Sequence, residues 1–168
     1  MRSEPDEHLF PRAARQVGTA RGAYARLRLG LPGIHQRDNA RVAVVLLEEI
    51  GSALGFEVSP DAVRRGLAAV RWPGRLQWVA GDPPVLLDGA HNPGAARELA
   101  GSIACGFSYD RLIAGMGIMA DKDIKNIIRL ISPAADYIIC TRPDYYRAAD
   151  PGRILSIHVG MAEAACRE

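Results

Sequence analysis

One loop limits the possible folds of this chain more than any other feature. It reads DGAHNP over residues 88–93 and follows a short apolar run at residues 85–87. Asn92 is a good N-cap, and Pro93 suits the first helical position, where a missing N–H costs nothing. The apolar positions that follow recur at helical spacing: Ala96, Leu99, Ala100 and Ile103. The loop is therefore predicted to join a strand to a helix N-terminus, a place where anions bind in open α/β sheets.

A second turn-rich segment lies just upstream of this loop. Residues 72–75 read WPGR and residues 81–84 read GDPP, and both are typical of turns. The apolar runs at residues 76–80 and 85–87 are therefore predicted to be short strands.

Two helices are predicted before this region. The longer covers residues 38–54 and ends at Gly55, and Ser59 followed by Pro60 should open the second. Arg41, Glu48 and Glu49 are expected to face water. The other face of the longer helix is broad and apolar: Val42, Val45, Leu46, Leu47, Ile50 and Leu54.

Downstream, strand and helix patterns alternate, which predicts a parallel sheet covered by helices. The strands are expected at residues 112–116 and 137–141, with a helix at 124–131 and a short one from 150 to 155. Residues 26–29 also alternate like a strand. The loops at 88–93, 117–123 and 141–144 should emerge at one carboxyl edge, where ligands bind. They offer six polar candidates: Asp88, His91, Asp121, Lys122, Asp123 and Arg142.

Each candidate has a plain structural alternative. Asp88 can simply end a strand, and His91 can be a hydrogen-bonded loop histidine. Lys122 between two aspartates can form a surface ion pair worth less than about 1 kcal/mol. Arg75 can be a turn residue.

Composition excludes several function classes. The apolar fraction of 48%, the charged fraction of 24% and the net charge of +2 are ordinary for a globular protein. The arginine-rich start is not accompanied by a recognisable nucleic-acid-binding module, so we predict no nucleic-acid partner. No long apolar stretch or signal peptide is present, so we predict a cytoplasmic chain without membrane contact. Neither GxxxxGK[ST] nor GxGxxG occurs, and the three cysteines share no metal-binding spacing.

Four segments in order resemble the folylpolyglutamate and dihydrofolate synthases, a branch of the Mur ligase family. Residues 35–40 read HQRDNA, 72–75 read WPGR, 88–93 read DGAHNP and 120–123 read ADKD. The resemblance implies an α/β, Rossmann-like and mostly parallel sheet flanked by helices, the Mur ligase C-terminal domain, preceded by a helical segment. It also implies an ATP-dependent ligase that joins L-glutamate to a folate or dihydropteroate through an acyl phosphate.

By matching positions, the resemblance assigns Asn39, Arg75 and Asp88 to ATP. It assigns His91 and Lys122 to catalysis, with His91 near the phosphates or the incoming glutamate; the specific roles of Lys122 and Arg142 stay open. Mg²⁺ is implied as well, with ligands expected in an N-terminal domain and none in this sequence.

The domain organisation implied by the resemblance is a tail of the central ligase domain at 1–71 and the C-terminal domain at 72–168. Such a fragment is expected to be inactive alone, because no phosphate-cradling loop is present. One alternative is a stand-alone α/β module that binds a nucleotide or small anion. Another is a nucleic-acid-binding protein that uses the arginine-rich start. The sequence leaves the oligomeric state open.

Overall fold

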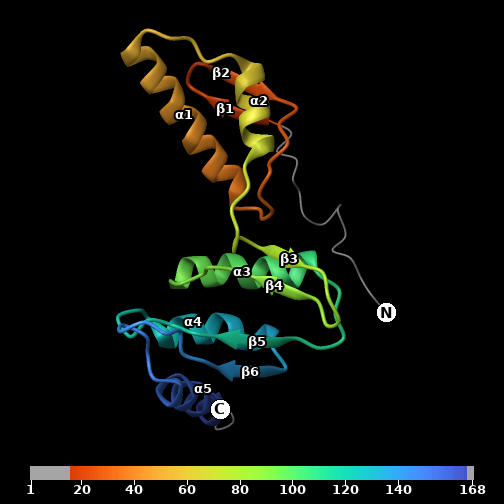
Figure 1. Cartoon of the computed structure of the whole chain (residues 1–168), viewed down its shortest axis with the longest axis vertical. Coiled ribbons are helices and arrows are strands. Elements are labelled where there is room, and N and C mark those ends of the chain that lie inside the picture. The colour runs from red at the N-terminus through yellow and green to blue at the C-terminus, as the bar shows by residue number, and fades with distance from the viewer. Residues whose placement is uncertain (1–15, 166–168) are drawn as a thin grey trace. The chain divides into compact units, whose positions relative to one another are not determined.

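The computed structural model describes residues 16–165, with side chains described as far as residue 160. Arg2, Arg12 and Arg15 of the arginine-rich start lie outside this range. The chain forms two compact units that divide between Gly89 and Ala90. We call described residues 16–89 the N-terminal unit and residues 90–165 the C-terminal unit, and we describe each by itself (Figure 1).

The N-terminal unit begins with a hairpin that the sequence patterns did not predict. Strand β1 (Gln16–Thr19) pairs antiparallel with β2 (Gly22–Ala25), and Val17 lies opposite Tyr24. The strand expected at residues 26–29 is wrong. Arg26 has a positive φ of 58°, and the segment forms no ladder. Its alternation instead reflects Leu27 and Leu29, which both reach the core.

Two helices follow, and their ends match the predicted signals. Helix α1 (Gln36–Leu54) stops at left-handed Gly55, and α2 (Pro60–Ala69) starts after Ser59, whose side chain accepts a hydrogen bond from Ala62 N. Contacts of α1 with β1 and of α2 with β2 close a small core. It consists of Val17, Tyr24, Leu27, Leu29, Ala40, Val44 and Val63.

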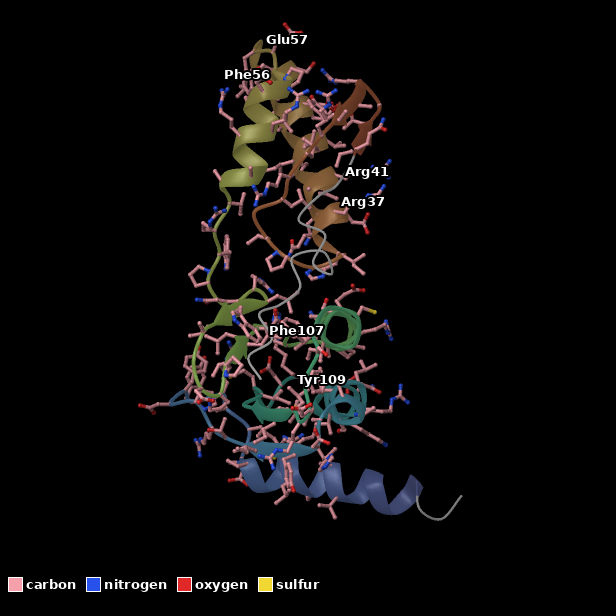
Figure 2. The ribbon with its side chains drawn as sticks, turned by 90° about the vertical axis from the view of Figure 1, so that its right-hand side faces the viewer. Arg37, Arg41, Phe56, Glu57, Phe107 and Tyr109 are labelled. Carbon is pink, nitrogen blue, oxygen red and sulfur yellow. The ribbon has the colours of Figure 1, made fainter. Side chains whose placement is uncertain are left out.

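The predicted water-facing side of α1 is partly wrong. Arg37 and Arg41 project from one side of the helix into solvent (Figure 2), but Glu48 is buried. Its Oε1 accepts hydrogen bonds from Tyr24 Oη at 2.8 Å and Thr19 Oγ1 at 2.9 Å. These donors lie on the hairpin, so the inner face of α1 is set by polar pairing and small residues.

The broad apolar face predicted for α1 lies largely outside that core. Glu48 faces the hairpin because Thr19 and Tyr24 donate hydrogen bonds to it. The side of α1 that carries the large apolar residues therefore faces away from the core. The following apolar residues of α1 are exposed: Val42, Leu46, Leu47, Ile50 and Leu54.

A second hairpin ends the N-terminal unit. Strand β3 (Gln77–Val79) pairs antiparallel with β4 (Val85–Leu87), and Trp78 lies opposite Leu86. The turn-forming residues 81–84 connect the strands, as predicted.

The C-terminal unit has the alternating order that the sequence predicts. It runs α3 (Pro93–Gly106), β5 (Ile113–Met116), α4 (Ile124–Ile131), a 3₁₀ turn η1 (Ser132–Ala134), β6 (Tyr137–Cys140) and α5 (Pro151–Ala165). The last helix is longer than the predicted one at 150–155. Asn92 Oδ1 accepts from Ala95 N at 2.9 Å and so caps α3, as predicted.

Strands β5 and β6 pair in parallel, and helices cover one of their faces (Figure 1). Helix α4 contacts both α3 and α5, and its four isoleucines, at 124, 127, 128 and 131, are all buried. Ala114, Met116 and Cys140 pack on this cluster, and burial raises the pKa of the Cys140 thiol. The unit therefore has the predicted α/β class, with a parallel pair flanked by helices. Within residues 16–165, no helix is both long and apolar enough to cross a membrane.

Two valines on α1 test which side of that helix is packed. Val44 is 2% exposed and Val42 is 58% exposed. We expect Val44→Ala to lower the free energy of unfolding by roughly 1–3 kcal/mol, because it leaves a cavity. Val42→Ala is the matched control and should change it by less than about 0.5 kcal/mol. Denaturant unfolding followed by circular dichroism measures both, and equal losses would contradict this packing.

A pH series tests the hydrogen bond between Tyr24 and Glu48. Burial, the bond itself and the charge of Glu48 raise the pKa of Tyr24. A raised pKa stabilises the fold below the ordinary tyrosine value of about 10, and this stabilisation is lost as the pH rises through the folded-state pKa. Tyr24→Phe should therefore cost about 1–3 kcal/mol at neutral pH and progressively less at alkaline pH.

Tyr137→Phe is the control for that series, because Tyr137 is exposed and lies in the C-terminal unit. Tyr137→Phe should change the free energy of unfolding by close to zero at every pH of the series. A cost of Tyr24→Phe that does not change with pH would show that the Tyr24 hydroxyl contributes nothing through its ionisation.

Candidate functional site

The WPGR turn and the DGAHNP loop meet at one end of the β3–β4 hairpin. The register places Gln77 opposite Leu87, so Leu76 and Asp88 are the next facing positions. Asp88 Oδ2 accepts a hydrogen bond from Leu76 N at 2.9 Å, and Gly89 N donates to Gly74 O at 2.8 Å. Two motifs that are separate in the sequence thus form one bonded structure.

The hydrogen bond from Leu76 holds an unusual backbone. Leu76 has a φ of 43°, in a region that residues other than glycine seldom adopt. Its side chain is buried, so the local conformation is fixed from both sides. The structural interpretation of Asp88 is therefore correct, and a role toward a nucleotide stays a prediction beside it.

Arg75 lies between the turn and β3, and its side chain is half-buried. Within residues 16–165, it forms no ion pair with another side chain. A guanidinium presents five N–H donors in one plane, which suits bidentate contact with phosphate. The plain alternative of a turn residue is compatible with this position, because Arg75 directly follows Gly74, whose φ is 72°.

Asn39 is oriented by its neighbours at the start of α1. Its Nδ2 donates to Gln36 Oε1 at 3.0 Å, and Gln36 Nε2 lies 3.0 Å from His35 Nε2. Gln36 is buried, so it fixes the amide of an exposed Asn39. A Cβ on Gly33 would meet the Leu76 side chain at 3.0 Å, so the segment before this network lies against the WPGR turn.

The other predicted site residues lie in the C-terminal unit. His91 is exposed, next to the N-cap of α3, and Arg142 is exposed just after β6. Asp123 caps α4 by accepting from Asn126 N at 3.2 Å. Its bonds with the Asn126 side chain and backbone lower the pKa of Asp123, so its role in the structure is that of a helix cap.

Lys122 forms the surface ion pair that the plain alternative predicted, but not as an isolated pair. Its Nζ lies 3.3 Å from Asp121 Oδ2, and Arg147 Nη1 lies 3.8 Å from the same oxygen. Partial desolvation acts to raise the pKa of Asp121, but a backbone hydrogen bond, Lys122 and Arg147 outweigh it and lower that pKa. Asp121 is therefore ionised at neutral pH, between two cations.

The prediction that three loops share one carboxyl edge is confirmed for two of them. β5 and β6 are parallel, so residues 117–123 and the loop after β6 emerge on the same side. The loop at 88–93 follows β4, which pairs with β3 in a separate antiparallel sheet. Its position at that common edge stays a prediction.

Sequence reasoning missed three residues that shape these sites. Leu76 supplies a backbone N–H, Gln36 links His35 to Asn39, and Arg147 joins the Asp121–Lys122 pair. The HQxxNA spacing could have indicated Gln36, because positions three apart share a helix face. Leu76 and Arg147 act through partners at least twelve residues away, which no local pattern reveals.

The described residues do not fit a metal centre of their own. Nowhere in residues 16–165 do three or more His, Cys, Asp or Glu side chains gather where an ion could bind. We therefore assign no metal ligand among these residues.

Three comparisons with known proteins point to the same family. The family model for the Mur ligase, glutamate ligase domain, matches residues 74–165. The dihydrofolate synthase/folylpolyglutamate synthase of Mycobacterium tuberculosis is 36% identical over 130 residues, covering 77% of this chain and 27% of that protein. The chain thus spans between a quarter and a third of that relative's length.

Two solved structures are similar as well. Mycobacterium tuberculosis folylpolyglutamate synthase complexed with ADP is 34% identical, with a TM-score of 0.73, covering 82% of this chain and 30% of that one. A bifunctional folylpolyglutamate synthase/dihydrofolate synthase with Mn, AMPPNP and L-glutamate bound is 28% identical, with a TM-score of 0.66, covering 83% and 32%. With the family model matching more than half of its residues, the chain belongs to the Mur ligase family, whose glutamate ligase domain it carries.

Proposed function

We propose that this chain provides the glutamate ligase domain of an ATP-dependent ligase that joins L-glutamate to a folate or dihydropteroate. In such a reaction, ATP converts a carboxylate to an acyl phosphate. The amino group of glutamate then attacks it, forming an amide and releasing phosphate. The observation that carries the proposal is the bonded WPGR–DGAHNP structure, in a chain 36% identical to a dihydrofolate synthase/folylpolyglutamate synthase. A similar solved structure holds ADP, which supports nucleotide binding by the family.

The chemistry of the site agrees with this reaction. Phosphoryl transfer depends on cations and positioned donors around a charged transition state. We propose that Arg75 contacts the phosphates and that Asp88 and Asn39 contact the sugar or base of ATP. The half-buried position of Arg75 and the fixed amide of Asn39 support these roles. His91 and Lys122 are proposed to act near the phosphates or the incoming amino group.

The domain boundary is also a proposal. We assign residues 1–71 to the tail of a central ligase domain and 72–168 to the C-terminal domain. The exposed apolar face of α1 supports a larger domain around the first segment, because such faces are normally covered.

We propose that the ligase also uses Mg²⁺. A bound Mg²⁺ neutralises charge on the transferring phosphoryl group. Because residues 16–165 offer no cluster for it, we propose that its ligands come from another part of the ligase. ATP and folates as substrates are consistent with action in the cytoplasm.

A hybrid enzyme tests the function. In the Mycobacterium tuberculosis relative, this chain would replace the part that it matches, and ATP-dependent addition of glutamate to a folate and to dihydropteroate would be measured. We expect activity in the hybrid. Arg75→Ala should lower kcat by roughly 10²- to 10³-fold, because a cation near the phosphoryl group is lost.

The control in that assay is Arg65→Ala, which removes an exposed arginine from α2 and should leave the rate unchanged. A folded hybrid that binds ADP but adds no glutamate to either acceptor would contradict the proposed function. Full activity of Arg75→Ala would contradict only the role of Arg75.

A further inference from the structure

The segment that follows β2 lies along helix α2. Arg64 Nε donates to Ala25 O at 3.3 Å, and Gly30 N donates to Leu67 O at 2.8 Å. A Cβ on Gly30 would clash with the backbone at the end of α2, so a glycine is what lets the two segments come this close. Residues 25–30 and helix α2 therefore form one continuous surface within the N-terminal unit.

Two arginines project from the segment itself. Leu27 and Leu29 are buried in the core of the N-terminal unit, while the alternate positions, Arg26 and Arg28, are exposed. In the part of the chain that the structure describes, neither arginine forms an ion pair with an acidic side chain. Both charges are therefore available to a ligand from solution.

Two further arginines border the segment on the α2 side, and backbone carbonyls hold both of them. Arg64 bonds to the segment, as above, and also pairs with Asp61. Arg71 Nη1 donates to two carbonyls at the end of α2, at 2.8 Å and 2.9 Å, and a Cβ on Gly30 would lie 2.8 Å from this nitrogen. A guanidinium has five N–H donors, so each group keeps donors for a ligand while its position is already fixed.

These four residues, Arg26, Arg28, Arg64 and Arg71, form what we call the arginine surface. Asp61 is the only acid in residues 25–30 and in α2, so the arginine surface carries an excess of three positive charges. The net charge of the whole chain is only +2. Like charges placed side by side weaken a fold. An anionic ligand that neutralises the arginine surface therefore explains this concentration of charge better than folding does.

The arginine surface leads directly to the candidate site. Arg71 immediately precedes the WPGR turn that contains Arg75. At the end of the segment, Gly33 lies against Leu76, because a Cβ on Gly33 would meet that side chain at 3.0 Å. A linear anion with one end at the candidate site can thus run along the arginine surface.

We propose that the arginine surface binds the glutamate tail of a folate that already carries several glutamates. This inference rests on the proposed function. Each addition of glutamate consumes one carboxylate and brings two, so the tail gains one negative charge at every round. A similar solved structure is that of a folylpolyglutamate synthase, whose name implies such a tail.

The chemistry of the arginine surface favours this ligand over a nucleic acid. A guanidinium fork matches a planar carboxylate with two parallel hydrogen bonds. Residues 25–30 and α2 contain no aromatic side chain on which a base can stack, whereas surfaces for single-stranded nucleic acid combine positive charge with such rings.

Calorimetric titration of the whole polypeptide tests whether affinity depends on the length of the tail. Folates with one, three and five glutamates are titrated separately, at low and at high salt. We expect the dissociation constant to fall by roughly 10- to 100-fold from one glutamate to five, because the added carboxylates form exposed ion pairs. The gain should shrink at high salt. An oligodeoxythymidylate of equal charge is the comparison polyanion and should bind more weakly.

Two double variants separate the arginine surface from the overall charge. Arg26→Asn with Arg28→Gln removes two charges, and asparagine tolerates the positive φ at position 26. This variant should weaken binding of the five-glutamate folate by roughly 5- to 30-fold and leave binding of the one-glutamate folate unchanged. Arg37→Gln with Arg41→Gln is the matched control. It removes the same charge from exposed side chains of α1 that point away from α2 in the view of Figure 2, and it should leave both affinities unchanged.

Three results would overturn the proposal. They are an affinity that does not rise from one glutamate to five, an equal loss of affinity in the two double variants, and tighter binding of the oligodeoxythymidylate than of the five-glutamate folate. The last result would assign the arginine surface to nucleic acid. Failure of the hybrid ligase with the length dependence intact would remove the proposed function and leave the arginine surface standing. An active hybrid without length dependence would do the reverse.

Discussion

The hydrogen bond from the Leu76 backbone to the Asp88 carboxylate is the interaction on which the candidate site depends. It joins the WPGR turn to the DGAHNP loop and holds Leu76 at a positive φ. Arg75 directly precedes Leu76, so it lies in the turn that this hydrogen bond closes. Leu76 also lies against Gly33, ahead of the network that orients Asn39. One carboxylate thus organises the surroundings of two residues proposed to contact ATP.

In the C-terminal unit, charged side chains lie at the carboxyl edge of the short parallel pair β5–β6. The buried isoleucines of α4 anchor the helix that follows the Asp121–Lys122 segment. A backbone bridge between Met119 and Ala148 then fixes the neighbouring loop. Charged side chains can therefore be held at this edge by a rigid backbone, without depending on ion pairs for their position.

Local features of this fold could be predicted, and long-range ones could not. The caps at Ser59 and Asn92 were predicted because a cap depends on residues three positions apart. The buried face of α1 could not be predicted in this way, because Glu48 is held inward by hydrogen bonds from Thr19 and Tyr24 of the hairpin. For the site, motif resemblance supplied the proposed residues, while their bonds to distant partners required the structure.

Hydrogen exchange at the Leu76 amide tests most directly whether Asp88 holds the turn. Asp88→Asn keeps an oxygen acceptor, whereas Asp88→Ala removes it. We expect the amide to be protected in the parent chain and in Asp88→Asn, and to exchange much faster in Asp88→Ala, while the amides of α4 keep their protection. Equal protection of Leu76 in Asp88→Ala would contradict the account, because the turn would then be held by something other than this carboxylate.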